Sequence, residues 1–262
     1  MSRRTDSSMP GRLGPWQYLQ NAMFYLHVSV ATLLMGAVGI LRVIRHGRAG
    51  ANRVATGWIG YVLWAAKLHM EVSCEVRGTP PTGDCIVAAK HQCFLDILAI
   101  AHAVPERNFI MKREVMRVPV MGWYAYKVGC IPIDRTRGRD AMRAIGSKIN
   151  QRIAGEGLGQ LIIYPEGTRT RPGERRSYKH GVGTIRAATG LPVVPVAVNA
   201  GLFWPRGGWG VRAGWAVVEF LPPIDPQLPS EAFMAELSEQ IEENSDRLMQ
   251  EAGFQRASGI RA

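Results

Sequence analysis

The twelve residues Cys85–Asp96, CIVAAKHQCFLD, combine a strand, a turn and the beginning of a helix. Cys85–Ala89 is uniformly apolar, as in a strand buried on both faces, and we expect the helix to open at Phe94-Leu95-Asp96. Within one helix, His91 and Asp96 would point well apart, because successive residues turn by about 100°. We therefore place His91 at the strand end or in the turn, where the Asp96 carboxylate can accept a hydrogen bond from one imidazole nitrogen.

This His–Asp pair admits two interpretations. The carboxylate can fix the imidazole tautomer that leaves the other nitrogen basic, which makes His91 a general base. Alternatively, Asp96 only complements a helix N-terminus and His91 is an ordinary turn residue. This stretch alone does not choose between them.

From Met70 onward, short apolar runs alternate with helical patterns, which is typical of an α/β sheet. The predicted strands are 72–77, 85–89, 107–112, 130–133, 160–164, 192–198 and 215–221, and the later helices are 120–128, 139–154, 182–189 and 230–251. The prolines of the strand 192–198 favour a sheet edge or strand ends. We predict an α/β domain over residues 70–262, with a mostly parallel mixed sheet flanked by helices.

The preceding residues 1–69 contain a basic tail and two apolar segments. Val28–Leu41 carries no charge, and with the residues back to Ala22 it reaches about 20 residues, close to the length that spans a bilayer. The second segment, Val54–Leu68, has Trp58, Tyr61 and Trp64 on one helical face, which suits the headgroup level. We predict a two-helix membrane anchor, spanning or lying in one leaflet, on the cytoplasmic face of the inner (plasma) membrane. The alternative is a pair of core-packing helices in a soluble domain.

The net charge of +11 indicates an anionic partner, which could be nucleic acid, lipid headgroups or a phosphorylated substrate. No nucleic-acid-binding motif is present. The four cysteines lack zinc-ligand spacing, and no Walker loop, Gly-x-Gly-x-x-Gly or Gly-x-Ser-x-Gly motif occurs, so we predict neither a metal nor a cofactor. Cys93 is a poor nucleophile candidate, because it lies two residues from His91 beside the bulky Phe94.

Three predicted strand ends carry polar residues: Lys90-His91, Asp134-Arg135 and Glu166–Arg169. Ligands bind at the carboxyl ends of strands in open α/β sheets, so these segments can converge on one site. Gly167 permits close backbone approach, Thr168 offers a hydroxyl, and the Arg169 guanidinium suits a phosphate. Without a serine or cysteine nucleophile, direct attack by a substrate hydroxyl deprotonated by His91 is the economical mechanism.

Four blocks of residues now resemble the glycerolipid acyltransferases typified by 1-acylglycerol-3-phosphate acyltransferase, over about residues 70–220. The blocks are HQCFLD at 91–96 (the HxxxxD motif), GCIPIDR at 129–135, YPEGTR at 164–169 and LPVVPV at 191–196. HxxxxD alone is a weak signal, but together with the Pro-Glu-Gly-Thr-Arg block at this spacing it is highly specific.

The resemblance implies a set of roles. His91 is the general base and Asp96 its orienting residue, acting on the sn-2 hydroxyl of lysophosphatidate, which attacks the thioester of acyl-CoA or acyl carrier protein and gives phosphatidic acid. The implied glycerol-phosphate contacts are Arg135, Glu166, Gly167, Thr168 and Arg169, with Lys112 as a further phosphate-side contact. The acyl chain requires an apolar groove, beside the aromatic segment 120–128 or between the domain and the bilayer.

Two residues depart from the family pattern: Lys90 stands where many members have Asn, and Cys93 where Ser is common. Neither touches the implied proton transfer, but both weaken the transfer of substrate preference. Two rival functions stay open. One is an acyltransferase for another lyso-lipid, such as lyso-ornithine lipid, and the other is a non-catalytic membrane protein that binds anionic lipid.

Overall fold

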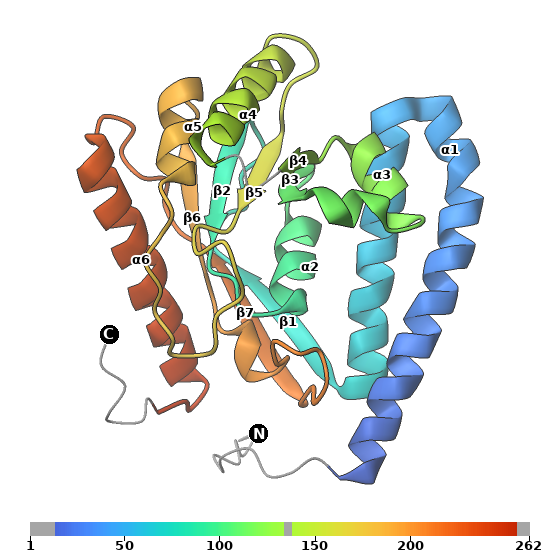
Figure 1. Cartoon of the computed structure of the whole chain (residues 1–262). Helices are drawn as coiled ribbons and strands as arrows, with labels where there is room; N and C mark the ends of the chain where they lie inside the picture. Colours follow the sequence, from blue (N-terminus) through green and yellow to red (C-terminus); the bar gives the residue numbers. More distant parts are fainter. Residues whose placement is uncertain (1–13, 134–137, 256–262) are drawn as a thin grey trace.

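A seven-stranded sheet forms the centre of the computed structural model, which describes residues 14–133 and 138–255 (Figure 1). The strands are β1 (Val72–Arg77), β2 (Cys85–Ala89), β3 (Arg107–Lys112), β4 (Ile131–Ile133), β5 (Gln160–Ile163), β6 (Val193–Val198) and β7 (Gly214–Phe220), in the spatial order β1-β7-β6-β2-β5-β3-β4. Neighbouring strands are parallel except for β6 and β7, which pair antiparallel. The predicted mostly parallel mixed sheet is therefore confirmed.

Helices cover both faces of this sheet (Figure 1). They are α1 (Pro15–Met70), α2 (Phe94–Ala103), α3 (Met121–Val128), α4 (Gly138–Ile153), α5 (Gly181–Thr189) and α6 (Ser230–Glu251), with short 3-10 turns η1 (Arg113–Arg117) and η3 (Ala200–Leu202). The side chains of β2 alternate between two apolar cores: Val87 packs on the α1 and α2 side, and Ile86 on the side of α4, α5 and α6. Both faces of β2 are thus buried, as its unbroken apolar run predicts.

The strand β6 corrects one expectation, because it lies inside the sheet rather than at an edge. Pro195 stands in the middle of β6, paired with Ala88 of β2. Its carbonyl accepts from the backbone N–H of Leu221, one residue beyond the end of β7. The side of Pro195 that lacks an N–H therefore faces the end of β7, so the missing donor costs the β6–β7 ladder at most one terminal bond.

The long helix α1 is folded into two arms at Gly47, whose backbone is non-helical (φ 52°, ψ −131°), and the arms lie side by side (Figure 1). The arms are joined by polar contacts, among them Trp58 Nε1 donating to Thr32 Oγ1 at 2.8 Å. Tyr124 of α3 donates to the carbonyl of Gly36 at 2.7 Å, which docks the first arm on the α/β region. An 18-residue window of α1 has a mean hydropathy of 1.9 with only 22% of it buried, so by length and composition it could cross a membrane.

Candidate active site

His91 and Asp96 meet in the turn that connects β2 to α2. Asp96 is the third residue of α2 and is fully buried, and its Oδ1 lies 3.0 Å from His91 Nδ1. Its Oδ2 accepts the backbone N–H groups of Gln92 and Cys93, both at 2.7 Å. The carboxylate therefore satisfies the helix N-terminus and the imidazole together, so both geometries expected from the sequence are present. With Nδ1–H donating to a carboxylate, the imidazole lone pair is on Nε2.

A buried charge network lies behind this turn. Lys90 Nζ is 2.9 Å from Glu166 Oε1 and 2.6 Å from Glu242 Oε1 of α6, and its side chain is 1% exposed. Glu166 Oε2 accepts the backbone N–H of His91 at 2.9 Å. Burial raises the pKa of Glu166, while Lys90 and these hydrogen bonds act against that rise. The network fixes the backbone that carries His91.

The Glu166 carboxylate therefore points to Lys90 and the His91 backbone, and not toward the expected position of a substrate phosphate. The backbone N–H of Gly167 donates to the carbonyl of Tyr164, which closes a tight turn, and Gly167 has φ +67°. This turn directs the Glu166 carboxylate inward to Lys90, whereas Gly167, Thr168 and Arg169 face a cleft.

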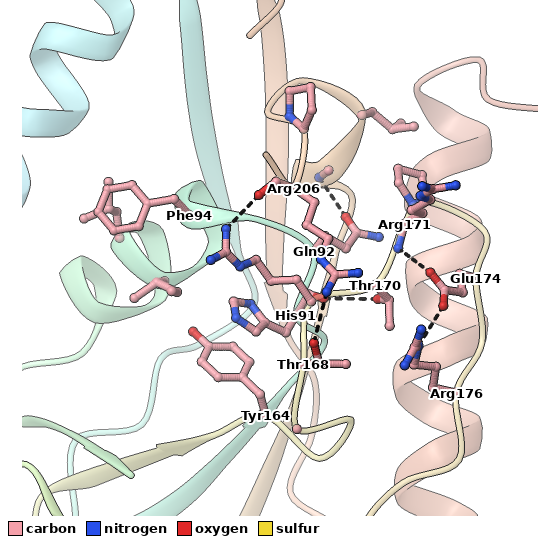
Figure 2. Close-up of a pocket in the computed structure, with 18 of the residues that line it drawn as sticks. His91, Gln92, Phe94, Tyr164, Thr168, Thr170, Arg171, Glu174, Arg176 and Arg206 are labelled. Carbon is pink, nitrogen blue, oxygen red and sulfur yellow. Dashed lines mark hydrogen bonds and ion pairs between the residues drawn. The ribbon is translucent and has the colours of Figure 1, made fainter. Parts of the chain in front are cut away.

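The cleft has a volume of about 2580 Å³, and His91 is one of the residues that line it. One part of its lining is apolar and another part is basic. The apolar lining comes from α1, α2, β3 and α3 and includes Trp58, Ile59, Phe94, Ile97, Leu98, Phe109, Met111 and Met121. The basic lining comes from the segments 167–179 and 205–212 and includes Arg169, Arg171, Arg176, Lys179, Arg206 and Arg212. Figure 2 shows Arg206, Arg171 and Arg176 on the opposite side of His91 from Phe94.

Two basic residues shape the polar part of the cleft, and the sequence did not single out the first of them, Arg206. Arg206 Nη2 donates to Thr168 Oγ1 at 3.4 Å, and the Arg206 carbonyl accepts from Arg169 Nη1 at 2.8 Å (Figure 2). Lys179 lies over Gly167, where an added Cβ would be 2.7 Å from Lys179 Nζ. Arg206 follows β6 in an irregular segment without a motif, so no sequence signal marks it.

Tyr164, the first residue after β5, was also missed as a site residue. Its ring stacks on the His91 imidazole, with centroids 4.0 Å apart and planes inclined by 23°. The strand order explains the contact, because β2 and β5 are parallel neighbours and their carboxyl ends lie together.

Comparisons with known proteins identify the family of this chain. A family model described as Acyltransferase matches residues 72–199, which include the His–Asp pair and the turn of Glu166. The 1-acyl-sn-glycerol-3-phosphate acyltransferase of Pseudomonas aeruginosa is 27% identical over 229 residues, which cover 86% of this chain and 88% of that protein. The chain belongs to the acyltransferase family.

Two further comparisons extend this assignment of the acyltransferase. The human 1-acyl-sn-glycerol-3-phosphate acyltransferase beta is 29% identical over 191 residues, covering 70% of this chain and 68% of that protein. The crystal structure of the 1-acyl-sn-glycerophosphate acyltransferase PlsC from Thermotoga maritima shares the fold, with a TM-score of 0.72 at 23% identity, covering 88% of this chain and 96% of that one.

The remaining predicted site residues of the acyltransferase are placed as follows. Lys112 ends β3 at the same edge of the sheet, although its side chain is outside what the structure describes, and Arg135 lies outside the described residues. Cys93 is fully buried at the start of α2, and burial, with Asp96 adding to it, raises the pKa of its thiol well above the usual value. A thiol held protonated away from the cleft is not a nucleophile. Within residues 14–133 and 138–255, no group of three His, Cys, Asp or Glu side chains is placed to hold a metal ion.

Proposed function

We propose that this acyltransferase moves a fatty acyl group from acyl-CoA or acyl carrier protein to the sn-2 hydroxyl of 1-acylglycerol-3-phosphate, which gives phosphatidic acid. The observation that carries the proposal is the position of His91 between an apolar and a basic wall of one cleft. A fatty acyl chain suits the apolar wall, and a glycerol phosphate suits the basic wall. The names of the relatives from Pseudomonas and human support the same acceptor.

The reaction follows from the His91–Asp96 geometry. His91 Nε2 takes the proton of the sn-2 hydroxyl while that oxygen attacks the thioester carbon and forms the new C–O bond. The tetrahedral intermediate then expels the thiolate, the C–S bond breaks, and the imidazolium returns the proton to sulfur. Asp96, 3.0 Å from Nδ1, stabilises the imidazolium between these two steps.

The phosphate of the acceptor is assigned to the turn after β5 and its neighbours. Thr168 and Arg169 face the cleft, Gly167 permits close approach, and Arg206 is linked to both of these side chains. Lys112, which ends β3, and Arg135 remain proposed contacts. Glu166 receives a different role, which is to hold the His91 backbone through its 2.9 Å hydrogen bond.

Residues 1–69 are proposed to anchor the enzyme, and residues 70–262 to form the acyltransferase domain. The first arm of α1 exposes large apolar side chains, including Leu34 at 63% and Val38 at 79%. Their insertion into one membrane would bring the apolar wall of the cleft near the lipid phase. With four unpaired cysteines and the Arg-rich turn between the arms, we place the enzyme on the cytoplasmic face of the inner (plasma) membrane.

The decisive test is release of free thiol from long-chain acyl-CoA by the purified protein in detergent, with and without lysophosphatidate. Wild type should release thiol only with the acceptor present, and His91→Ala should lose turnover by about 10²–10⁴-fold. His102→Ala, a change of an exposed histidine on α2 away from the cleft, is the matched control. If the protein transfers acyl groups only to another lyso-lipid, lysophosphatidate is not its acceptor. Lipid binding without any acyl transfer would contradict the proposal.

The phosphate assignment has its own test. Arg169→Ala should raise the Michaelis constant for lysophosphatidate by about tenfold, the effect of losing one charge-assisted hydrogen bond, with a smaller effect on kcat. Lys148→Ala removes an exposed positive charge on α4 and should change neither value. An unchanged Michaelis constant in Arg169→Ala would remove Arg169 from the phosphate site.

A further inference from the structure

The hydroxyl of Tyr164 is a buried polar group with no hydrogen-bond partner among the described residues. Buried polar atoms in folded proteins almost always have a partner, so each exception needs an explanation. Other buried groups of this site are satisfied: Asp96 accepts three hydrogen bonds, and Lys90 lies between two carboxylates. Among the described residues, Arg48, Asn52, Arg107 and Trp204 also carry a buried side-chain atom without a partner, but of these five residues only Tyr164 lines the cleft.

The position of this hydroxyl is specific. The Tyr164 ring stacks on His91, lines the cleft, and packs against the apolar core that also carries Phe94 and Phe109. Figure 2 shows the hydroxyl directed away from Thr168, toward the Phe94 side of His91. The hydroxyl therefore lies on the side of His91 that carries the apolar wall of the cleft, where the proposed function places the acyl chain and its carbonyl group.

A purely structural role does not account for the hydroxyl. Phenylalanine would provide the same stacking on His91 and the same packing against the apolar core, without burying an unpaired oxygen. The ring can be explained by packing, but the oxygen requires a partner that the protein itself does not provide.

We propose that the Tyr164 hydroxyl donates a hydrogen bond to the carbonyl oxygen of the acyl donor as negative charge develops on that oxygen during transfer. This inference rests on the proposed function and adds a catalytic residue to it. The phenol keeps its proton throughout, while His91 alone carries the proton from the acceptor hydroxyl to the leaving sulfur. A fixed donor in a water-poor site stabilises such charge strongly, because no solvent has to reorganise.

Burial also keeps the donor in the form that the proposal needs. It raises the pKa of Tyr164 well above its usual value, and the charge of Asp96 adds to this effect. The phenol therefore keeps its proton at neutral pH.

The test compares Tyr164→Phe with wild type in the acyl-CoA assay. The substitution removes one oxygen and keeps the ring, so we expect kcat to fall by about 10²–10³-fold, the usual effect of losing one oxyanion donor. Both Michaelis constants should stay within about twofold, and the melting temperature should not fall, because the lost hydroxyl had no partner. Tyr126→Phe, at a position 70% exposed on α3, is the matched control and should behave as wild type.

A second variant separates hydrogen bonding from packing. Incorporation of 3-fluorotyrosine at position 164 keeps the donor, so kcat should stay within a few-fold of wild type. If the wild type is active and Tyr164→Phe has the same kcat, this inference is overturned and the proposed function stays intact. A lower melting temperature with a proportional loss of folded protein would also overturn it, because it would assign the hydroxyl to structure. A wild type without acyl transfer would overturn both proposals.

Discussion

Lys90 and Glu242 form a buried ion pair, with Nζ 2.6 Å from Oε1, that joins the turn carrying His91 to α6. The two residues are 152 positions apart. Lys90 also contacts Glu166 at 2.9 Å and the carbonyl of Glu174 at 3.1 Å. A single ammonium group thus holds β2, the turn after β5, the basic segment beside the cleft and α6 in one arrangement.

Glu242→Gln is expected to lower the free energy of unfolding by about 1–3 kcal/mol, because Lys90 loses a charged partner while retaining Glu166. The urea midpoint gives this difference when the slope of the transition is unchanged. Glu243→Gln, at the exposed neighbouring position, removes the same charge and should leave the midpoint unaltered. Equal midpoints for both variants would show that α6 does not support the turn.

Asp96→Asn is expected to reduce kcat by about 10²–10⁴-fold with little change in either Michaelis constant. The amide oxygen can keep accepting the N–H groups of Gln92 and Cys93, but the amide NH₂ then faces His91 Nδ1. This contact favours the tautomer with the proton on Nε2, so the imidazole can no longer act as a base. Initial rates and the melting temperature together check the prediction, and a loss below tenfold would contradict the orienting role.

Local chemistry was predictable from the sequence. His91 and Asp96 are five residues apart, and a strand end followed by a helix N-terminus allows only a few relative placements of them. The strands and helices of residues 70–262 were likewise found from hydrophobic periodicity, because each element buries a continuous apolar face.

The partners across the fold were not predictable in the same way. The pattern of α6 marks Phe233, Leu237 and Ile241 as buried but gives Glu242 no reason to be inside, since its partner Lys90 comes from a distant strand end. Glu166 was assigned to substrate because a motif gives the order of residues in a turn and not the direction of each side chain. Only the three-dimensional turn, closed by the bond from Gly167 N–H to the Tyr164 carbonyl, decides that direction.

The cysteines of the folded enzyme should resist alkylation at pH 8. Burial raises the pKa of Cys74 and Cys85 to about 12 and of Cys130 to about 11, and it raises that of Cys93 as well. The reactive thiolate is therefore scarce. Mass spectrometry after iodoacetamide treatment should show unmodified protein with full activity, whereas four adducts should form in urea. Cys93→Ser should retain kcat, and a loss beyond tenfold would restore Cys93 as a nucleophile candidate.

The first arm of α1 should bind membranes through its outward apolar side chains. Leu34 and Leu41 are 63% and 75% exposed, so Leu34→Asp with Leu41→Asp should leave the circular dichroism spectrum unchanged. Sedimentation with vesicles containing anionic lipid should show binding at least about tenfold weaker, because each aspartate in the hydrocarbon region costs about 2.5–3.5 kcal/mol.

The double substitution also lowers the net charge of +11 by two, which alone weakens attraction to anionic lipid. Gln227→Asp with Gln250→Asp adds the same two charges at exposed positions of the α/β domain and serves as the control. Insertion of the first arm predicts a much larger loss for the leucine pair than for the glutamine pair. Equal losses of vesicle binding in the two double variants would mean that charge alone attaches the protein to the membrane. The first arm of α1 would then not insert into the bilayer.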